Sequence, residues 1–380
     1  MNSRILKERI VYINPIKIAQ LSGFYKMIKN QYKTFDFSLL NKKIYDIREC
    51  GICGGDWDLE VFPFKEHSIY KSFVEIMKGS KKEDTEEYKK LLFSKGKEKT
   101  DVVFKKWLEL YASIKKKGYV LNTSVDPWDE YITICIGRDG QLFFHNGGHR
   151  LAVCLFLGIS SIPVKIAIRH TQWVYFIEKI KAYSKKHNNK IYTPINHIDL
   201  QSFETTYSSY RGELIKEYIN PKSKTVLDIG THWGYLSFIL ADIGKECYAI
   251  EHDPETYYFL NRINKISSNK IKTYCTDVDT FIFRKKQVFD CVLALNVFHH
   301  FLKTKETWER FCKMIKVLQF NEMFLQFAND EELLNHPKYT IRKTTKEILE
   351  LVGKNKKINI IGKEHNRVIY HIVDETVERK

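Results

Sequence analysis

The sequence predicts an α/β protein of two domains, and three observations carry that prediction. The chain has 380 residues, more than one hydrophobic core usually serves. Hydrophobic residues make up 43% of it and aromatic residues 14%, which is enough for packed cores. The C-terminal half alternates strand-like and helix-like apolar patterns, which is typical of a mostly parallel sheet covered on both faces.

The N-terminal half contains a shorter alternation of strands and one helix. An apolar strand pattern is followed by a tight Arg-Asp-Gly turn, a hairpin strand, a helix that opens with Asn-Gly-Gly-His-Arg, and a final strand. These elements are predicted at residues 131–137, 138–140, 141–145, 146–158 and 162–170.

Two polar stretches guide the predicted domain boundaries. Lys78–Lys90 mixes both charge signs at helical spacing and indicates a solvated surface. Lys181–His197 is rich in Lys and Asn and contains a Pro, which favours a linker. We therefore predict a mostly helical extension at 1–119, a small α+β domain at 120–185, a linker at 186–204 and a second domain at 205–380.

Helix signals separate the strands of the second domain. Gly244 ends one helix, and Asp253 followed by Pro254 begins the next. Thr344 and Glu347 form a capping box before the last helix. A short loop joins the last two strands, which are therefore predicted to be antiparallel. The predicted strands are 224–230, 246–252, 271–277, 289–297, 322–328, 357–363 and 367–373.

A glycine-bearing turn and three acidic residues mark the second domain as a binding site. Gly230 and Gly234 lie between the first strand and its helix, where close approach of a ligand favours glycine. Asp228, Glu251 and Asp277 lie at the ends of three successive strands, which meet at one edge of a parallel sheet. A turn that needs glycine only for packing explains the glycines but not the three acids.

These residues resemble the motifs of class I S-adenosylmethionine-dependent methyltransferases over residues 205–380. The resemblance implies a Rossmann-like sheet of seven strands in the order 3-2-1-4-5-7-6, with the last strand antiparallel. It implies an enzyme with S-adenosylmethionine as cofactor. The resemblance implies that Gly230 and Gly234 pack against the methionine moiety, Glu251 binds the ribose and Asp277 the adenine. By its position at the strand end, Asp228 is suited to accept a hydrogen bond from an ammonium group or to order water near it, and Asn296 is a further candidate cofactor-binding residue. A nicotinamide-dependent oxidoreductase is disfavoured, because its G-x-G-x-x-G pattern is missing.

The fourth strand ends in Leu-Asn-Val-Phe-His-His-Phe, which bears on the methyl acceptor. Asn296-Val297-Phe298 lacks the prolines of the DNA amino-methyltransferases, and no Pro-Cys nucleophile for cytosine is present. The pattern is closer to enzymes that methylate small molecules or glycans. His299 or His300 is a candidate general base, since imidazole titrates near neutral pH. The alternative is that one of them caps the following helix or hydrogen-bonds the backbone.

The turn at 146–150 in the first domain predicts a phosphate site. Gly147 and Gly148 free the backbone at a helix N-terminus, and His149 and Arg150 add donors. Arg169 and the adjacent His170 end the next strand, and we expect them to face the same point. Asp56, Trp57 and Asp58 either reach this site as acids or form a turn with an aromatic anchor, and we favour the turn.

Residues 120–175 resemble the ParB/sulfiredoxin-like domain, whose members bind nucleotide phosphates on such a turn. The resemblance implies a nucleotide ligand for Gly147, Gly148, His149, Arg150 and Arg169. Gly148 stands where the sulfiredoxins have a cysteine, so their chemistry is not supported. Binding of a nucleotide is better supported than its turnover.

The remaining composition narrows the partners. No apolar run is long enough for a membrane span, no secretion signal is evident, and we expect a cytoplasmic protein. Cys50 and Cys53 have no second pair at a zinc-site spacing, so no metal site is predicted. A formal net charge of +16 favours anionic partners, although its lysines are scattered.

The sequence therefore supports two functional hypotheses. The preferred one is a methyltransferase acting on an oxygen or nitrogen of a small molecule or glycan, with an N-terminal nucleotide-binding domain. The alternative is a ParB-like nucleic-acid-binding protein that methylates or binds DNA or RNA. That alternative predicts binding that weakens steeply with salt.

Overall fold

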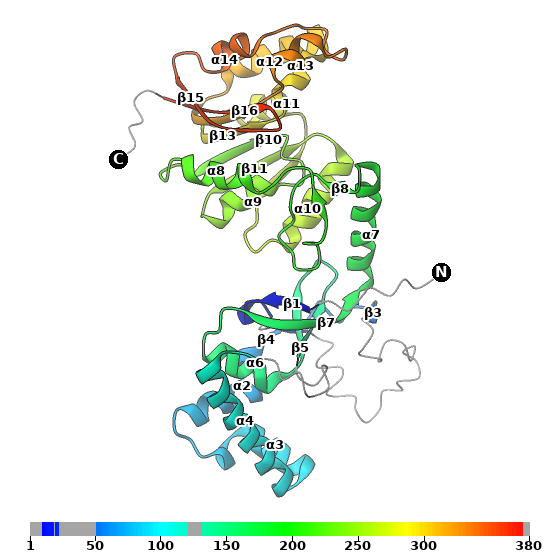
Figure 1. The fold of residues 1–380 in the computed structure, drawn as a ribbon, viewed down its shortest axis with the longest axis vertical. Helices are drawn as coiled ribbons and strands as arrows, with labels where there is room; N and C mark the ends of the chain where they lie inside the picture. Colours follow the sequence, from blue (N-terminus) through cyan, green and yellow to red (C-terminus); the bar gives the residue numbers. More distant parts are fainter. Residues whose placement is uncertain (1–9, 19, 23–50, 121–130, 375–380) are drawn as a thin grey trace. The chain divides into compact units, whose positions relative to one another are not determined.

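The structure is a computed structural model that describes residues 10–18, 20–22, 51–120 and 131–374 (Figure 1). The chain divides into two compact units, Met1–Ala182 and Tyr183–Lys380. The division falls within helix α7, Thr171–Lys186. Cys50 of the predicted thiol pair lies outside the described residues.

One mixed sheet forms the centre of the first unit. Its order is β1-β7-β5-β6-β2-β4, and β3 also pairs with β7. Four of these seven strands come from residues 1–119, the segment predicted to be a mostly helical extension. Besides helices α2, α3 and α4, this segment therefore supplies strands to the sheet of the small domain. The strands are β1 Ile10–Ile13, β2 Gln20–Ser22, β3 Gly51–Cys53, β4 Val61–Pro63, β5 Ile132–Ile136, β6 Leu142–Asn146 and β7 Ile162–His170.

Helices of the first unit pack around α6, which follows the Asn-Gly-Gly-His-Arg turn. Phe73 of α2 stacks on Trp107 of α4 with ring centroids 5.1 Å apart, and the Trp107 ring contacts His149 of α6. The helices of this unit before α7 are η1 Pro15–Ile18, η3 Phe64–Glu66, α2 Ser68–Met77, η4 Lys82–Asp84, α3 Glu86–Lys95, α4 Lys97–Lys117 and α6 Gly148–Phe156.

The directions of the strands decide which loops lie at which end of this sheet. β5 and β7 are parallel, with Ile132 beside Val164 and Ile136 beside Arg169. β6 is antiparallel to β5, so its last residue, Asn146, lies beside Thr133 at the other end. The turn after β6 and the end of β7 therefore lie at opposite ends of the sheet.

A second seven-stranded sheet forms the centre of the second unit. Its order is β12-β11-β10-β13-β14-β16-β15, which is 3-2-1-4-5-7-6 when the strands are numbered along the chain. β10 to β14 pair in parallel, and β16 is antiparallel to both of its neighbours. The strands are β10 Thr225–Ile229, β11 Glu246–Glu251, β12 Lys272–Cys275, β13 Phe289–Leu295, β14 Phe320–Gln326, β15 Lys357–Glu364 and β16 Arg367–Val373.

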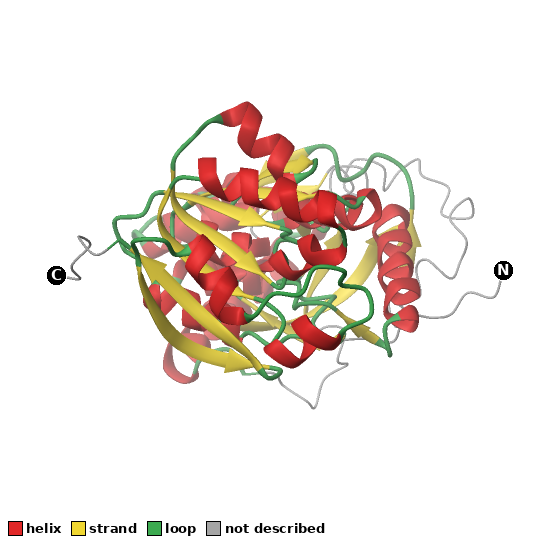
Figure 2. Ribbon diagram, turned by 90° about the horizontal axis from the view of Figure 1, so that it is seen from above, coloured by secondary structure: helices red, strands yellow, loops and turns green. Residues whose placement is uncertain are grey.

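Helices cover both faces of this sheet (Figure 2). Ile215 of α8, Leu240 of α9 and Leu260 of α10 pack on one face, whereas Phe281 of α11 and Phe311 of α12 pack on the other. The predicted caps at Asp253 and at Thr344 with Glu347 are confirmed. The helices after α7 are α8 Tyr210–Tyr218, α9 Tyr235–Asp242, α10 Pro254–Ile266, α11 Val278–Lys285, η5 Phe298–Lys303, α12 Lys305–Val317, α13 Asp330–Asn335 and α14 Thr345–Val352.

Residues 186–204, predicted to be a linker, are instead folded into the second unit. Two short strands, β8 Lys190–Ile191 and β9 Glu204–Thr205, pair and bring the ends of this segment together. Ile195 and Leu200 between them are buried. The polar composition hid this role, because buried apolar residues are sparse in the segment. Within the described residues, no helix is long and apolar enough to cross a bilayer.

Candidate functional site

Asp228 lies at the carboxyl end of β10 and is buried. Its Oδ2 accepts hydrogen bonds from the hydroxyls of Thr231, at 2.6 Å, and Ser237, at 2.7 Å. Burial raises the pKa of this carboxyl, although the two hydroxyls oppose the shift. The carboxylate is thus fixed in a dry position where a cationic ligand group would find a partner.

Gly230 and Gly234 have left-handed backbones, with φ of +64° and +82°. A Cβ on Gly230 would lie 2.6 Å from Cγ2 of Val297, and one on Gly234 would lie 2.6 Å from Cδ1 of Leu260. Both positions therefore need glycine for the turn and for packing against the protein itself. Gly230 also lines the hollow beside Asp228.

Glu251 ends β11 and is buried at the same edge. Its carboxylate accepts hydrogen bonds from the backbone N–H groups of His232, at 3.0 Å, and Asp253, at 2.9 Å. Burial raises the pKa of Glu251, and these N–H donors oppose that shift. The two bonds tie the glycine turn to the next strand-helix connection and leave further acceptor capacity on the carboxylate.

Asp277, by contrast, is exposed, and it lies directly before α11. Its carboxylate is 3.4 Å from Nη2 of Arg310, which also grips the buried Asp279 at 2.7 Å and 2.8 Å. The three acids predicted from strand ends thus occur at the ends of three adjacent strands, β10, β11 and β12.

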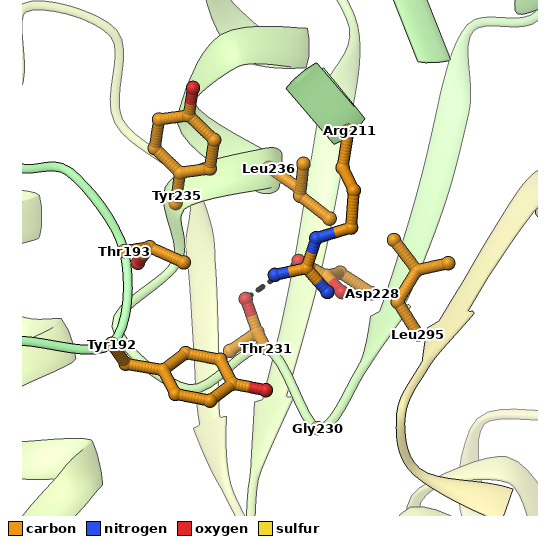
Figure 3. A pocket seen from close by; sticks show the side chains of 9 residues that line it. All are labelled: Tyr192, Thr193, Arg211, Asp228, Gly230, Thr231, Tyr235, Leu236 and Leu295. Atoms are coloured by element: carbon orange, nitrogen blue, oxygen red, sulfur yellow. Dashed lines mark hydrogen bonds between the residues drawn. The ribbon is translucent and has the colours of Figure 1, made fainter. Parts of the chain in front are cut away.

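Arg211 is a site residue that the sequence did not reveal. It lies on α8, is buried, and lines the same hollow as Asp228 (Figure 3). Its guanidinium stacks over the ring of Tyr207 at 3.8 Å, and its Nε is 3.0 Å from a carboxylate oxygen of Glu364. A single arginine in the first turn of a helix carries no motif, so only long-range folding identifies it.

Tyr192 and Thr193 were also missed, because they lie in the segment predicted to be a linker. Both line the hollow, which contains about 340 Å³ of empty space, part of it open to solvent. The Tyr192 ring lies 4.2 Å from that of His232, and burial raises its pKa to about 12. The residues lining the hollow are Tyr192, Thr193, Arg211, Asp228, Gly230, Thr231, Tyr235, Leu236 and Leu295.

Asn296 follows β13 with a left-handed backbone, φ +62°, and is buried. Its side-chain amide donates to the hydroxyl of Tyr207 at 3.2 Å and accepts from Nη1 of Arg367 at 2.9 Å. Arg367 is in turn held by Glu332. The side chain of Asn296 is therefore oriented by two residues that the sequence pattern did not single out.

His299 and His300 follow Asn296 within η5 and differ in exposure. His299 is buried, and burial together with nearby positive groups lowers its pKa to about 3, so it is neutral at physiological pH. His300 is exposed. Neither caps α12, whose N-cap is Thr304. That part of the alternative reading is wrong, because the chain makes a further turn before α12 begins.

The turn before α6 has a partly structural explanation. Gly147 has φ of +91°, and a Cβ there would lie 3.1 Å from the Cα of Ile132. The His149 ring packs edge-on against Trp107 at 4.4 Å, and the indole N–H of Trp107 donates to the His149 carbonyl. His149 is thus held between α4 and α6, and the backbone N–H of Gly147 donates to Oδ1 of Asn146 at 2.8 Å.

Arg169 does not converge with this turn, so that expectation is wrong. Arg169 lies beside Ile136, while Gly147 follows the residue beside Thr133. Three to four residues of strand separate the two positions, roughly 10–13 Å. The antiparallel direction of β6 is the cause, because it carries the glycine turn to the opposite end from the end of β7.

Asp56 and Asp58 also lie away from the glycine turn. Asp58 is buried and bonded to Arg138 in the β5–β6 turn, at 2.5 Å to its N–H and 2.9 Å to its Nε. Arg138 Nη2 contacts Asp56 at 2.8 Å. Trp57 packs edge-on against Phe143. The favoured interpretation, a turn with an aromatic anchor, agrees with these contacts.

Comparison with known proteins identifies the class of the second unit. Residues 227–320 match the family described as "Methyltransferase domain". The chain contains a methyltransferase domain. This confirms the predicted enzyme class. The matched region extends from Leu227 in β10 past the end of β13, so it includes Asp228, Glu251 and Asn296. No curated protein matches the sequence.

Solved structures overlap with part of the chain at low identity. Monomeric WbdD is 19% identical, with 52% of this chain and 49% of WbdD covered and a TM-score of 0.42. ChlM, the magnesium protoporphyrin IX methyltransferase of Synechocystis PCC 6803, was solved with bound SAM and is 16% identical, with 44% and 77% covered and a TM-score of 0.34. The N-terminal domain of EvdMO1, solved with SAH, is 12% identical, with 52% and 97% covered and a TM-score of 0.37. The match thus spans less than half of WbdD.

Proposed function

We propose that the second unit transfers a methyl group from S-adenosylmethionine to an oxygen or nitrogen of a small molecule or glycan. One observation carries the proposal: buried Asp228 and buried Arg211 line the same hollow with opposite charges. The amino-acid end of S-adenosylmethionine has an ammonium and a carboxylate on one carbon. A cation partner and an anion partner within one small hollow fit that pair.

The remaining candidate residues have roles along the rest of the cofactor. Arg211 binds the carboxylate, Asp228 the ammonium, Glu251 the ribose hydroxyls, and Asp277 the exocyclic amine of the adenine. Gly230 and Gly234 keep the turn close to the methionine moiety. When bound, S-adenosylmethionine supplies an electrophilic methyl group on a positively charged sulfur.

Asn296 and His299 lie on the acceptor side in this proposal. Asn296 presents an amide whose orientation Tyr207 and Arg367 set, so it is suited to hold an acceptor hydroxyl or amine. His299 is neutral and able to accept a proton, although a pKa of about 3 makes it a weak base. We place the exposed His300 at the rim of the acceptor side. Holding the acceptor in line contributes most of the rate.

For the first unit we propose binding of a nucleotide phosphate by Gly147, Gly148 and Arg150. The support is the backbone N–H groups at the start of α6 together with one arginine. Arg150→Ala should weaken the binding of ATP and ADP in calorimetry. Unchanged affinity for every nucleotide tested would reject this part and leave the methyltransferase proposal intact.

Calorimetric titration with S-adenosylhomocysteine tests the main proposal. The wild-type protein should bind it, and mass spectrometry of the purified protein should find the cofactor or its product carried along. Absence of binding at millimolar concentration would reject the proposal. The nucleic-acid alternative would gain support from DNA binding whose affinity falls steeply as salt rises.

A further inference from the structure

The turn between β15 and β16 reaches the proposed cofactor site from the far edge of the sheet. Glu364 ends β15 and is paired directly with Arg367, the first residue of β16. His365 and Asn366 between them both have left-handed backbones, with φ of +48° and +62°. Two such residues make the tight hairpin loop whose twist matches the strands, so the position of Glu364 is well defined.

Glu364 makes contacts that bear on Arg211. Its Oε2 is 3.0 Å from Nε of Arg211, and its Oε1 accepts from the hydroxyl of Ser208 at 3.1 Å. The side chains of Arg211 and Glu364 are only 4% and 11% exposed. A buried guanidinium needs such a partner, because an unpaired charge is costly away from water.

A second contact fixes the plane of the guanidinium. The ring of Tyr207 lies under it at 3.8 Å, and Gln326 Oε1 is 3.5 Å from its Nη1. With Nε in ion-pair contact with Glu364 and one face on an aromatic ring, the side chain has little freedom left. Figure 3 shows the guanidinium extending into the hollow beside Thr231 and Asp228.

We propose that Glu364 is a positioning residue for cofactor binding: it holds Arg211 so that the guanidinium meets the cofactor carboxylate. The inference rests on the proposed function and adds a residue 44 positions beyond the region, residues 227–320, that matches the methyltransferase family. Glu364 contacts Arg211 at Nε, so the Nη groups keep donor capacity for the ligand beyond the one bond from Nη1 to Gln326. Without the charge of Glu364, the guanidinium of Arg211 is no longer held in place. The affinity for ligands that have the amino-acid end of the cofactor should then fall, and the affinity for ligands without it should not.

A comparison of two ligands distinguishes this positioning role from a general disruption of the site. S-adenosylhomocysteine has the amino-acid end, whereas 5′-methylthioadenosine has the same nucleoside without it. Calorimetry on the full chain should show tighter binding of the former by the wild type. Glu364→Gln should lose about tenfold of the affinity for S-adenosylhomocysteine and keep that for 5′-methylthioadenosine. Arg211→Gln should do the same, and the double variant should lose no more than Arg211→Gln alone.

Glu213→Gln is the matched control, since Glu213 is an exposed acid on α8 whose carboxylate accepts a hydrogen bond from Ser209. It should bind both ligands as the wild type does. If Glu364→Gln does not fold, Ser208→Ala is the substitute variant, because it removes the hydrogen bond that orients Glu364. It should reduce the ratio of the affinity for S-adenosylhomocysteine to that for 5′-methylthioadenosine by about twofold.

The outcomes are distinct. A Glu364→Gln protein that keeps the wild-type preference, or that loses affinity for both ligands equally, would overturn the positioning role while the proposed function stands. A wild type that binds neither ligand overturns the proposed function itself, and the positioning role with it.

Discussion

The two glycine turns of this protein look alike in sequence and differ in what surrounds them. Each follows a strand, begins a helix, and has a left-handed glycine immediately before that helix, Gly147 in one unit and Gly234 in the other. Each glycine is explained by backbone and packing alone. What distinguishes the second turn is its neighbours: Asp228 and Glu251 end adjacent strands at the same edge.

Strand direction explains the difference. In the second unit, five successive strands pair in parallel, so every carboxyl end arrives at one edge and the residues there accumulate. In the first unit, antiparallel β6 carries its turn to the opposite end from Arg169 and Arg138. A glycine turn therefore identifies a ligand site only when the directions of the neighbouring strands are known.

Arg138→Ala is the largest predicted effect, and it tests whether the first turn stands apart from the acids. Burial favours a raised pKa for Asp58, but the hydrogen bonds from Arg138 outweigh it and lower that pKa. Loss of the arginine leaves a buried carboxylate unpaired, so the free energy of unfolding should fall by about 3 kcal/mol in chemical denaturation. Nucleotide affinity should be unchanged. If Arg138→Ala keeps its stability but no longer binds nucleotide, Arg138 belongs to the phosphate site. The contrast between the two glycine turns would then be wrong.

Glu251→Ala should weaken S-adenosylhomocysteine binding by about a hundredfold, because two hydrogen bonds to a charged acceptor are removed. Calorimetry measures this, and Glu255→Ala, an exposed acid four residues on, is the control. A circular dichroism melt checks that the protein stays folded without the hydrogen bonds that the backbone N–H groups of His232 and Asp253 donate to Glu251. Undiminished affinity would remove Glu251 from the site.

Gly230→Ala should cost about 2 kcal/mol of stability, and Gly244→Ala about 1 kcal/mol. Both residues have positive φ, but a Cβ at Gly230 meets Val297 at 2.6 Å, while nothing lies within 4 Å at Gly244. Thermal unfolding measures both, and Val297→Ala should recover part of the loss in the Gly230→Ala protein. Equal costs at the two glycines would mean that packing at the site contributes little.

The pH dependence of binding is the smallest predicted effect. Burial raises the pKa of Asp228, and an ammonium ligand needs this carboxylate ionised. Affinity for S-adenosylhomocysteine should therefore fall relative to that for 5′-methylthioadenosine as pH is lowered, beginning above the ordinary range of aspartate. Titration of both ligands across pH measures the ratio. The raised pKa of Glu251 affects the binding of both ligands, so its effect cancels in the ratio of their affinities. A constant ratio would exclude Asp228 as the ammonium partner.

The sequence predicted what local and periodic patterns determine. The strands and helices of 205–380, the cap at Asp253 and the three acids at strand ends all follow from spacing within one or two elements. The turn at 146–150 and the helix after it were predicted for the same reason. Such features need no knowledge of which strand pairs with which.

Features that depend on distant pairing were missed. Arg211 becomes a site residue only because Glu364, 153 positions away, and Tyr207 hold it over the first strand. The segment 186–204 looked like a linker because its polar composition conceals a few buried anchors. Arg169 lies away from the turn at 146–150 because antiparallel β6, which the predicted hairpin implies, carries that turn to the opposite end of the sheet.

The most direct test of the central claim is a crystal structure of the protein with S-adenosylhomocysteine. We expect density in the hollow beside Gly230, with the ligand ammonium within hydrogen-bond distance of Asp228 and its carboxylate on the guanidinium of Arg211. Glu251 should contact the ribose hydroxyls. Density for the ligand elsewhere, or with its amino-acid end turned away from both Asp228 and Arg211, would contradict the account.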